Sequence, residues 1–547
     1  MARSRPIRMP PEATYAMANG LRVMANAARR RQAAPDYVVF TLAGVYPDLA
    51  PTRSFLQQRL LPPVTDLFAL AHQLRSVGGD PRVRGVVLHL RPLAMPLAQL
   101  QTLRDLVLRL REAGKRVVAW SHSLDTAGYY VASAADEIVL QPGTPVAPLG
   151  LRRRYAFLAD ALERAGMAFD VVQISPYKSA GDALARRSMS EEARAMANWL
   201  IDADFEEVVR GIADGRGIGI DAARALVDGT PCTDLQALAA GLVDALLGEE
   251  DLPDHLADGG TPARLQTWEA ARKHVLLPRL PRGGRHVALI RIEGLIVDGE
   301  SEHPPLVPPV PVPLAAEARA GDLTVVQAAR AALEDDDVAA VVVYVDSGGG
   351  SATASEAMAA ALGRLAARKP VVVAMGAVAA SGGYYVATPA HWIVAQPSTV
   401  TGSIGVLSGK LVTAGLLDKL RFNRETFTRG AHADLDTGEH AYSPDERARM
   451  QGQIARVYAV FTDRVAAARR LDGAALEAVA GGRVWTGRQA LAHGLVDELG
   501  GLERAFEKAR ALAGLHPRTM VAPLRMAAPR RAPVPSAAAA LAYVADG

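Results

Sequence analysis

Short, continuous runs of apolar residues recur along the chain and predict a sheet buried between layers of helices. Val86–Leu90 and Val341–Val345 are two such runs, rich in β-branched residues, as expected for parallel strands covered on both faces. Helical stretches separate these runs from the next predicted strands. One helix is predicted to begin at Ser443, because Ser443, Pro444 and Glu446 match a capping box with a first-turn proline. The pattern therefore predicts an α/β fold.

The pattern occurs twice, which predicts an internal duplication. Thr126–Ala132 aligns without a gap with Ser381–Ala387 at a spacing of 255 residues (381 − 126 = 255), and the same spacing relates Gly150 to Gly405. Self-similarity at a fixed spacing is the signature of repeated structural units. Two tandem copies of one α/β domain are therefore expected.

The duplication also sets the predicted domain boundaries. The first copy is expected at residues 36–248 and the second at 286–515, joined by a connector at 249–285 with a helix around Trp268. Residues 1–35 and 516–547 are predicted to be flexible segments. A proline-rich segment at 304–313 is expected to be extended and exposed, either as a flap near the substrate or as a linker.

Composition narrows the classes of function. The 547 residues carry a formal net charge of only +3, so no global electrostatic field favours a nucleic-acid partner. The single cysteine, Cys232, excludes an intrachain disulfide and a CxxC zinc site, and a packing role is expected for it. No metal or cofactor is expected. We find no signal peptide and no run of ~20 apolar residues, so we expect a cytoplasmic or peripherally membrane-associated protein.

A candidate nucleophile lies in the second copy. Ser381 follows an apolar strand at the bend into a predicted helix, where the N–H of Gly382 is free to bind an oxyanion. The run Gly348–Gly350 follows another predicted strand and can supply a second N–H donor, because glycines leave the backbone unobstructed. The alternative role for Ser381 is that of a simple helix cap.

The two copies keep different candidate catalytic residues. At the positions that match Ser381 and the glycine run, the first copy has Thr126 and the glycine-free segment Arg91–Met95. Only the first copy keeps Lys178, whose matching position (178 + 255 = 433) is Ala433. Complementary loss predicts that the two copies build one site together.

Lys178 is the candidate base that would activate the Ser381 hydroxyl. Lowering a lysine pKa from about 10.4 to around 7 requires roughly 4 to 5 kcal/mol of destabilisation of the ammonium, which burial can supply. Tyr177 and the small residues after Lys178 suit a shielded site, whereas a lone lysine in a loop is usually a solvated surface group. His391 and His432 are alternative bases, although no Ser-His-Asp order or GxSxG elbow is present.

Together, these motifs resemble those of the SppA signal peptide peptidases (protease IV, serine peptidase family S49) in their long form with two tandem copies. The resemblance covers about residues 36–515. It is carried by Tyr177–Ala180, Ala379–Tyr385, Thr401–Gly405, Trp485–Gly487 and Gly494–Asp497. It implies tandem duplicated crotonase/ClpP-like domains and a Ser-Lys dyad whose members come from opposite halves of the chain.

The resemblance also implies a role for each candidate residue. Ser381 would be the nucleophile and Lys178 the general base. Ser403 would hold the lysine amine in place by a hydrogen bond. The backbone N–H groups of Gly382 and Gly350 would form the oxyanion hole.

This chain departs from the family pattern in two places. Where the family loop usually reads Ser-Pro-Gly-Gly, Gly348 replaces the proline, which predicts a more flexible loop before ligand binds. The N-terminal membrane anchor of many long-form members is not recognisable, which favours a peptidase that acts off the membrane or at its surface.

The resulting hypothesis is a serine endopeptidase that degrades signal peptides or other unfolded, hydrophobic peptides through an acyl-enzyme. The resemblance implies a ring-shaped homotetramer, and peripheral membrane association is compatible with it. Two other classes remain open. A catalytically degenerate peptide-binding scaffold would explain Gly348 as lost constraint. A crotonase-type acyl-CoA enzyme would use the glycine loop on a thioester, but it would need a pair of carboxylates.

Overall fold

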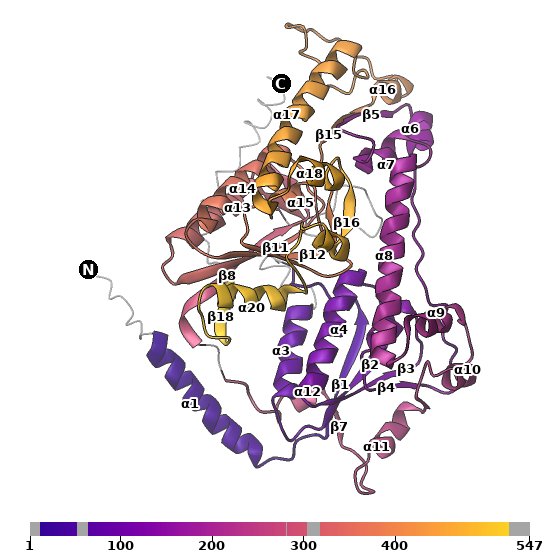
Figure 1. Ribbon diagram of the computed structural model, residues 1–547, viewed down its shortest axis with the longest axis vertical. Helices are drawn as coiled ribbons and strands as arrows, with labels where there is room; N and C mark the ends of the chain where they lie inside the picture. The colour runs from indigo at the N-terminus through magenta and orange to yellow at the C-terminus, as the bar shows by residue number, and fades with distance from the viewer. Residues whose placement is uncertain (1–10, 52–58, 60–63, 280–281, 303–317, 524–547) are drawn as a thin grey trace.

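The computed structural model describes residues 11–51, 59, 64–279, 282–302 and 318–523. Two α/β units lie against each other, with the first copy in indigo to magenta and the second in salmon to yellow (Figure 1). The predicted proline-rich segment at 304–313 lies outside the described residues, as do 1–10 and 524–547. The α/β class and the tandem duplication follow the sequence prediction.

The first copy is built on a six-stranded parallel sheet in the order β6-β4-β3-β2-β1-β7. Its strands are β1 (Tyr37–Gly44), β2 (Gly85–Leu93), β3 (Arg116–Ser121), β4 (Glu137–Leu140), β6 (Ala245–Leu246) and β7 (Leu265–Thr267). The larger helices of this copy are α3 (Leu67–Gly78), α4 (Leu97–Glu112), α5 (Thr126–Ala132), α8 (Glu191–Arg216), α9 (Ile220–Asp228) and α10 (Asp234–Ala239).

The second copy repeats this sheet. Strands β8 (Arg282–Glu293), β11 (Val338–Ser347), β12 (Val371–Ala380), β13 (Trp392–Ala395), β17 (Glu498–Leu499) and β18 (Thr519–Pro523) take the places of β1, β2, β3, β4, β6 and β7. β14 (Val400–Gly402) continues the sheet beside β12, and β16 (Val484–Thr486) pairs antiparallel with β14. A separate pair is formed by β9 (Leu295–Val297) and β10 (Arg319–Gly321).

The helices of the second copy are α13 (Asp322–Glu334), α14 (Ala352–Ala366), α15 (Gly382–Tyr385), α16 (Ala414–Lys419), α17 (Pro444–Arg469), α18 (Gly473–Val479), α19 (Gly487–Ala492) and α20 (Leu502–Leu512). The predicted capping box at Ser443 is confirmed, since its side chain accepts from Glu446 N and Glu446 bonds back to Ser443 N. α8 and α17 are both 26 residues long and begin 253 residues apart (444 − 191 = 253). The long helices therefore repeat along with the sheets.

The structure differs from the predicted boundaries at the ends of both copies. Strand β7 lies in the expected connector and strand β18 in the expected flexible tail, yet each pairs with the first strand of its own copy and completes the sheet. The helix expected around Trp268 is present as α12 (Trp268–Ala271). The same region holds α11 (Leu252–His255) and the 3₁₀ turn η2 (Glu249–Asp251). Residues 11–30 form the helix α1 (Pro11–Arg30), where a flexible segment was expected.

One element joins the copies directly. Strand β5 (Ala168–Gln173) of the first copy pairs antiparallel with β15 (Leu407–Val412) of the second, which makes a two-stranded ribbon at the upper right of Figure 1. The ribbon leads from β5 to the short turn η1 (Ser179–Gly181) and α7 (Asp182–Ala185), next to α6 (Ala159–Ala165). It thereby carries the chain around Lys178 from the first copy to the second.

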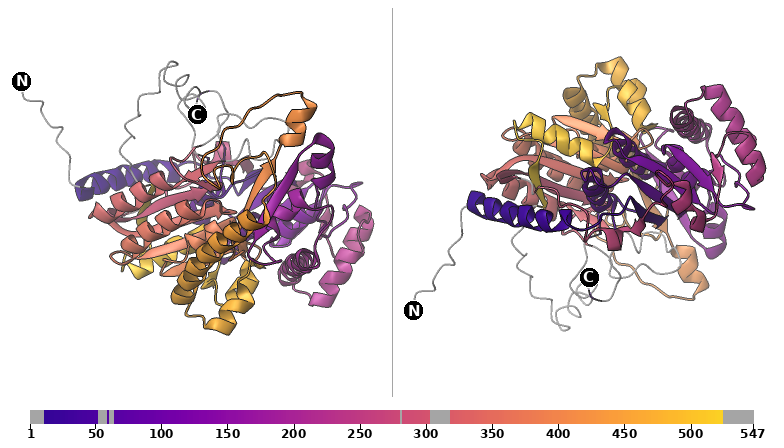
Figure 2. Two further views of the ribbon diagram at one scale, coloured as in Figure 1. Left: turned by 90° about the horizontal axis from the view of Figure 1, so that it is seen from above. Right: turned by 90° about the horizontal axis from the view of Figure 1, so that it is seen from below.

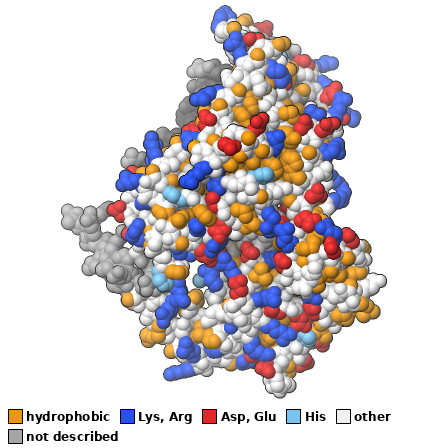
Figure 3. Space-filling model, viewed as in Figure 1, with side chains coloured by type: hydrophobic (Ala, Val, Ile, Leu, Met, Phe, Trp, Pro, Cys, Tyr) orange, Lys and Arg blue, Asp and Glu red, His pale blue; other side chains and the backbone are white. Residues whose placement is uncertain are grey.

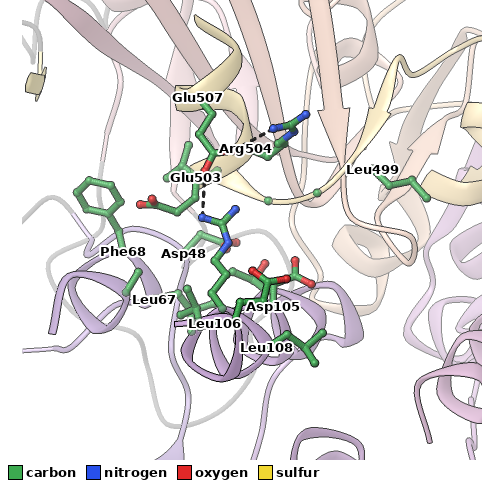
Figure 4. A pocket seen from close by; sticks show the side chains of 17 residues that line it. Asp48, Leu67, Phe68, Asp105, Leu106, Leu108, Leu499, Glu503, Arg504 and Glu507 are labelled. Carbon is green, nitrogen blue, oxygen red and sulfur yellow. Dashed lines mark hydrogen bonds and ion pairs between the residues drawn. The ribbon is translucent and has the colours of Figure 1, made fainter. Parts of the chain in front are cut away.

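A cavity of about 510 Å³ lies at the seam between the copies. Figure 4 shows Asp105 of α4 on one wall and Arg504 and Glu507 of α20 on the other. None of the candidate site residues lines this cavity. The two views of Figure 2 show the sheets of the copies side by side, with α1 along one edge.

The described helices include none that is both long and apolar enough to cross a membrane. On the face seen in Figure 3, acidic and basic side chains are interspersed and form no single-sign field. The distribution on this face agrees with the nearly balanced charge of the sequence.

Candidate active site

Ser381 follows the last residue of β12 in a backbone conformation that few serines adopt. Its φ is 55° and its ψ is −120°, whereas the L residues of regular elements have negative φ. Such conformations cost of the order of 1–3 kcal/mol and cluster at functional sites. The Ser381 side chain makes no capping hydrogen bond to α15. The role of a simple helix cap is therefore not the one this side chain has.

Lys178 reaches the Ser381 hydroxyl from the other copy. Lys178 Nζ lies 2.9 Å from Ser381 Oγ, 2.9 Å from Ser403 Oγ and 2.8 Å from the Ser403 carbonyl oxygen. The lysine side chain is only 4% exposed. Burial lowers the pKa of Lys178 to about 7. The amine is therefore largely neutral slightly above neutral pH and can accept a proton.

The three contacts match the bonding capacity of a neutral amine. A neutral lysine has two N–H donors and one lone pair, and Ser403 offers a carbonyl and a hydroxyl oxygen as acceptors. When both N–H groups point to Ser403, the lone pair is left for the Ser381 hydroxyl proton. Ser403 itself has a φ of 51°, and its N–H donates to Arg483 O at 2.7 Å. This geometry fixes the direction of the amine.

Glycines let the backbone approach the lysine closely. A Cβ on Gly482, whose φ is +92°, would lie 2.6 Å from Lys178 Cα, and a Cβ on Gly405 would lie 3.2 Å from Lys178 Cδ. The Gly482 N–H also donates to Ile404 O at 2.7 Å, beside Ser403. Both glycines belong to the second copy. Together with the β5·β15 ribbon, they enclose a side chain that belongs to the first.

The glycine loop at 347–350 packs directly against Ser381. A Cβ on Gly349 would lie 2.9 Å from Ser381 Cβ and 2.6 Å from Gly382 N, so only glycine fits there. A Cβ on Gly382 would lie 3.3 Å from Gly350 N. Within the described residues, the N–H groups of Gly350 and Gly382 have no protein acceptor, whereas that of Gly349 donates to Ser347 Oγ at 3.1 Å. Two free N–H groups thus lie close together beside the serine.

Hydrogen bonds anchor this loop although it lacks the family's proline. Ser347 Oγ donates to Gly294 O at 2.5 Å, and Ile296 exchanges two backbone hydrogen bonds of 2.9 Å with Gly349 and Ser351. Gly348 is exposed, and a Cβ there would meet nothing within 4 Å. The flexibility expected from Gly348 is therefore countered by bonds that the sequence does not reveal.

Comparison with known proteins places this geometry in a family. The model of Peptidase family S49 matches residues 109–260, which include Lys178, and residues 363–516, which include Ser381 and Ser403. These two segments cover more than half of the chain.

The chain belongs to peptidase family S49.

Relatives with assigned names agree with this membership. The S49 chain is 30% identical to the chloroplastic serine protease SPPA of Arabidopsis thaliana over 445 residues, 80% of this chain and 64% of that protein. It is 31% identical to Protease 4 of Salmonella typhi over 460 residues, 82% of this chain and 72% of that protein. The chain thus spans about two thirds of the length of these relatives. Membership makes it part of a family of serine peptidases.

A solved ClpP1 mutant from Listeria monocytogenes matches 40% of this chain and 94% of its own length, with 12% identity and a TM-score of 0.24. The tandem α/β domains of the predicted fold class agree with the two family segments and the two matching parallel sheets.

The two histidines considered as alternative bases in this S49 chain, His391 and His432, lie elsewhere. His391 Nδ1 accepts the N–H of Val371, the first residue of β12, at 3.1 Å. Because β12 has ten residues and Ser381 follows the last, His391 and Ser381 lie roughly 30 Å apart. His432 is exposed and lies 3.7 Å from Asp445. Neither side chain reaches the serine.

Some residues of the S49 site carry no recognisable signal in the sequence. Gly482 and Arg483 contact the lysine loop or Ser403 but lie 79 and 80 residues beyond Ser403 (482 − 403 = 79; 483 − 403 = 80). The alignment of the two copies does predict one matching strand contact, made by Cys232 in the first copy and Trp485 in the second. Cys232 and Trp485, which match in sequence, make equivalent antiparallel bridges to Val146 and Thr401. The packing role predicted for Cys232 is consistent with its partly buried position beside the first core.

Proposed function

We propose that the protein is a serine endopeptidase in which Ser381 is the nucleophile and Lys178 the general base. The observation that carries the proposal is the 2.9 Å contact between Lys178 Nζ and Ser381 Oγ in a shielded setting. A base must lie within about 2.6–3.2 Å of the proton that it removes. Two residues 203 positions apart in a duplicated chain meet at this distance, with the amine neutral near pH 7.

In the proposed reaction, the Ser381 oxygen attacks the carbonyl carbon of a peptide bond while its proton passes to Lys178. The resulting oxyanion accepts hydrogen bonds from the N–H groups of Gly382 and Gly350. The tetrahedral intermediate collapses, the C–N bond breaks, and Lys178 returns its proton to the leaving amine. Water, deprotonated by the same lysine, then hydrolyses the acyl-enzyme and regenerates the Ser381 hydroxyl.

Ser403 acts in this scheme as the group that orients the amine. Its two oxygen atoms take both N–H groups of Lys178, so the lone pair points at Ser381. A cavity of about 200 Å³ begins at Ser179, next to the lysine, and has apolar walls that include Met196, Leu200 and Val484. An apolar cavity at this place favours peptide substrates with hydrophobic side chains.

The alternatives explain the same observations less well. A peptide-binding scaffold needs no buried lysine with a lowered pKa, and such a lysine costs stability. An acyl-CoA enzyme of crotonase type would need a carboxylate at the reacting centre, yet the polar atoms around Lys178 Nζ all come from serines. A proteolytic function needs no further group.

Labelling with a fluorophosphonate probe tests the assignment of the nucleophile. We expect one adduct per chain, located by mass spectrometry on the peptide that contains Ser381, and none in Ser381→Ala. Binding of CoA in a thermal-shift assay, without labelling, would favour the acyl-CoA alternative. Labelling that survives in Ser381→Ala would defeat the assignment.

We also propose that the chain forms a ring-shaped homo-oligomer, a tetramer by resemblance. Support comes from two segments that match the β5·β15 ribbon in the duplication but have no strand partner within the described chain. Residues 152–157 correspond to β15 (407 − 255 = 152) and residues 423–428 to β5 (168 + 255 = 423). Both are largely exposed, with Phe427 at 85% and Tyr155 at 48%. Pairing between neighbouring chains would repeat the ribbon, and such head-to-tail contacts close into rings.

A cysteine cross-link tests this contact. Gly409 pairs with Val171 in the ribbon, so the repeated register places Arg154 of one chain opposite Thr426 of the next. In a Cys232→Ser background, Arg154→Cys combined with Thr426→Cys is expected to form covalent oligomers on mild oxidation. Each single variant is the control and should stay monomeric on a denaturing gel. A dimer in either single variant, or none in the double variant, would contradict the proposed register.

Finally, we propose that α1 associates peripherally with an anionic membrane surface. Its polar face points inward: Asn26 exchanges hydrogen bonds of 3.0 and 2.8 Å with Leu277, and Arg22 and Arg29 donate to nearby carbonyls. The opposite face is apolar, and its residues Met17, Leu21 and Met24 are 54%, 62% and 71% exposed. Residues 11–31 carry four arginines and one glutamate, a charge that favours anionic lipid.

Flotation with phosphatidylserine vesicles tests the membrane proposal. The wild-type protein should float with these vesicles, and Leu21→Asp together with Met24→Asp should stay at the bottom of the gradient. Vesicles of phosphatidylcholine alone are the control for charge. If the double variant changes the oligomeric state but not flotation, the apolar face of α1 instead binds a second copy.

A further inference from the structure

Strand β12 contains a bulge shortly before Ser381. Its pairing with β11 shifts between Val345 and Ser347, where three residues of β12, 376–378, face Asp346 alone. Extra residues in one strand leave backbone groups without ladder partners and bend the strand. The bend at the bulge therefore sets the direction in which β12 runs toward Ser381.

The Asp346 side chain supplies the missing acceptor. Asp346 Oδ1 accepts the N–H of Val378 at 3.0 Å, and the N–H of Ala377 also stabilises the carboxylate charge. Burial raises the pKa of Asp346, whereas these two N–H groups act in the opposite direction. Buried N–H groups without partners are costly, so the carboxylate stabilises this irregular backbone.

Two further residues, Thr399 and Tyr344, contact the bulge. Thr399 Oγ1 donates to the Gly376 carbonyl at 2.8 Å. A Cβ on Gly376 would lie 2.6 Å from the Tyr344 hydroxyl and 2.8 Å from Asp346 Cβ, so only glycine allows this approach. The backbone that leads to Ser381 is therefore enclosed on both sides.

The first copy lacks this arrangement. The position that matches Asp346 (346 − 255 = 91) is Arg91, whose guanidinium lies 2.9 Å from His122 Nε2. Strands β2 and β3 stay in regular register up to the pair Leu90 and Ser121. The carboxylate is thus present only in the copy that carries the serine.

We infer that Asp346 is a positioning residue: its carboxylate fixes the bulge at 376–378 and thereby aims the Ser381 hydroxyl at Lys178. Asp346 is also followed directly by Ser347, the first residue of the glycine loop. One side chain therefore couples the loop that carries an oxyanion donor to the bend that carries the nucleophile. This inference rests on the proposed catalytic role of Ser381.

The test compares Asp346→Ala and Asp346→Asn with the wild-type protein. For Asp346→Ala we expect kcat and the maximal rate of fluorophosphonate labelling at Ser381 to fall about 100-fold, because small misplacement of a reacting group has effects of this size. KM should stay within about twofold, because the substrate contacts are unchanged. Asparagine keeps one acceptor for Val378, so Asp346→Asn should lose only about tenfold.

Asp48→Asn is the matched control. Asp48 is a buried carboxylate that accepts the Tyr344 hydroxyl at 3.0 Å, whereas Asp346 is half-buried; among the described residues, Asp48 makes no hydrogen bond to the bulge. Its substitution should lower Tm while leaving the labelling rate of the folded protein within about twofold of wild type. An unchanged labelling rate in Asp346→Ala, or an equal loss in Asp48→Asn, would overturn the inference. A wild-type protein that never labels at Ser381 would instead defeat the proposed function.

Discussion

The two copies are each built on a sheet with the same order of six strands, but they use the matching backbone position in opposite ways. In the first copy, the Thr126 hydroxyl donates to Gly150 O at 2.9 Å and accepts Gly150 N–H at 3.0 Å. In the second, the matching Ser381 has a strained backbone, and its hydroxyl faces Lys178. A hydroxyl that already bonds to two backbone groups is held in place. The difference shows that the backbone conformation around a matching hydroxyl decides whether it bonds to its own copy or faces the other.

The segment before each hydroxyl explains how the copies diverge. Asp125 precedes Thr126 and caps α5, its side chain accepting Gly128 N–H at 2.8 Å. Ala380 precedes Ser381 and has no side-chain acceptor to cap α15, and the backbone at Ser381 adopts a positive φ. In the first copy, the residue before the hydroxyl caps a helix. In the second copy, neither Ala380 nor Ser381 makes a side-chain capping bond to α15.

The largest expected effect comes from removing each hydroxyl in turn. Ser381→Ala should lower kcat/KM for a peptide substrate by on the order of 10⁴-fold or more, because the nucleophile is lost. Thr126→Ala should keep activity within about threefold and lower the free energy of unfolding by about 1 kcal/mol, as expected for a lost hydrogen bond. Peptidase assays and urea unfolding measure both. Equal activity losses would mean that the Thr126 hydroxyl itself takes part in catalysis.

The next largest effect concerns the lysine and pH. Burial lowers the pKa of Lys178 to about 7, and the proposed base is the neutral amine. We therefore expect kcat/KM to fall about tenfold per pH unit below pH 7 and to level off above it. Lys178→Met should lose on the order of 10³-fold above pH 7 and should lack this acidic limb.

Lys115 of the first copy provides the matched control for Lys178. It is also buried, and its Nζ donates only to the carbonyls of Asp80 and Val83, at 2.7 and 2.6 Å. Lys115→Met should leave the shape of the pH profile unchanged. An acidic limb of the profile that persists in a partly active Lys178 variant would assign the titration to another group.

Burial of Lys178 should also lower the free energy of unfolding of the protein. The unfolded lysine binds its proton up to about pH 10.4, and the folded one releases it near 7, so stability of the wild-type protein should rise with pH between these values. Below pH 7 the full cost of roughly 4 to 5 kcal/mol is present. Lys178→Met removes this cost but leaves Ser403 O without its donor, which offsets about 1–3 kcal/mol.

Denaturant unfolding at two pH values checks this expectation. Lys178→Met should be more stable than the wild-type protein at pH 7, and the difference should shrink as the pH approaches 10. If the substitution destabilises the protein at pH 7, the lysine is not held neutral by burial. That result would leave the contact with Ser381 intact but remove the explanation of its basicity.

Much of this comparison could be predicted from the sequence. Continuous apolar runs predicted the central strands, and the constant spacing predicted the duplication. Both patterns can be read directly from the sequence. Strands β7 and β18 were missed since they have only three and five residues and depend on partners far away in the chain. Helix α1 was missed because its polar face, not its apolar one, contacts the protein.

The site was predictable only as separate motifs. Ser381 and Lys178 could be proposed from complementary loss, but their distance depends on the β5·β15 ribbon, which joins different positions of the two copies. Gly482 lies far from both residues in the sequence, and its effect is a close backbone approach. Such contacts arise from tertiary packing, which single-sequence patterns do not encode.

A smaller effect should follow from Ser403→Ala. This change removes the hydroxyl that holds one N–H of Lys178, while the Ser403 carbonyl keeps the other. We expect kcat to fall about 10- to 100-fold, with KM nearly unchanged, because only the orientation of the base is lost. Ser403→Thr, which restores a hydroxyl, is the control and should recover part of the activity. A change confined to KM would argue that Ser403 contacts substrate instead.

The smallest effect should come from restoring the family's proline in the glycine loop. Gly348 has no left-handed φ, a Cβ there would meet nothing within 4 Å, and its N–H makes no hydrogen bond within the described residues, so none of these three features opposes a proline there. Gly348→Pro should stabilise the protein by about 0.4–1 kcal/mol by restricting the unfolded chain. Because Ser347 and Ile296 already anchor this loop, kcat should rise no more than about twofold. A tenfold gain in kcat would show instead that the wild-type loop is mostly out of position, and that the second copy's site forms fully only when substrate binds.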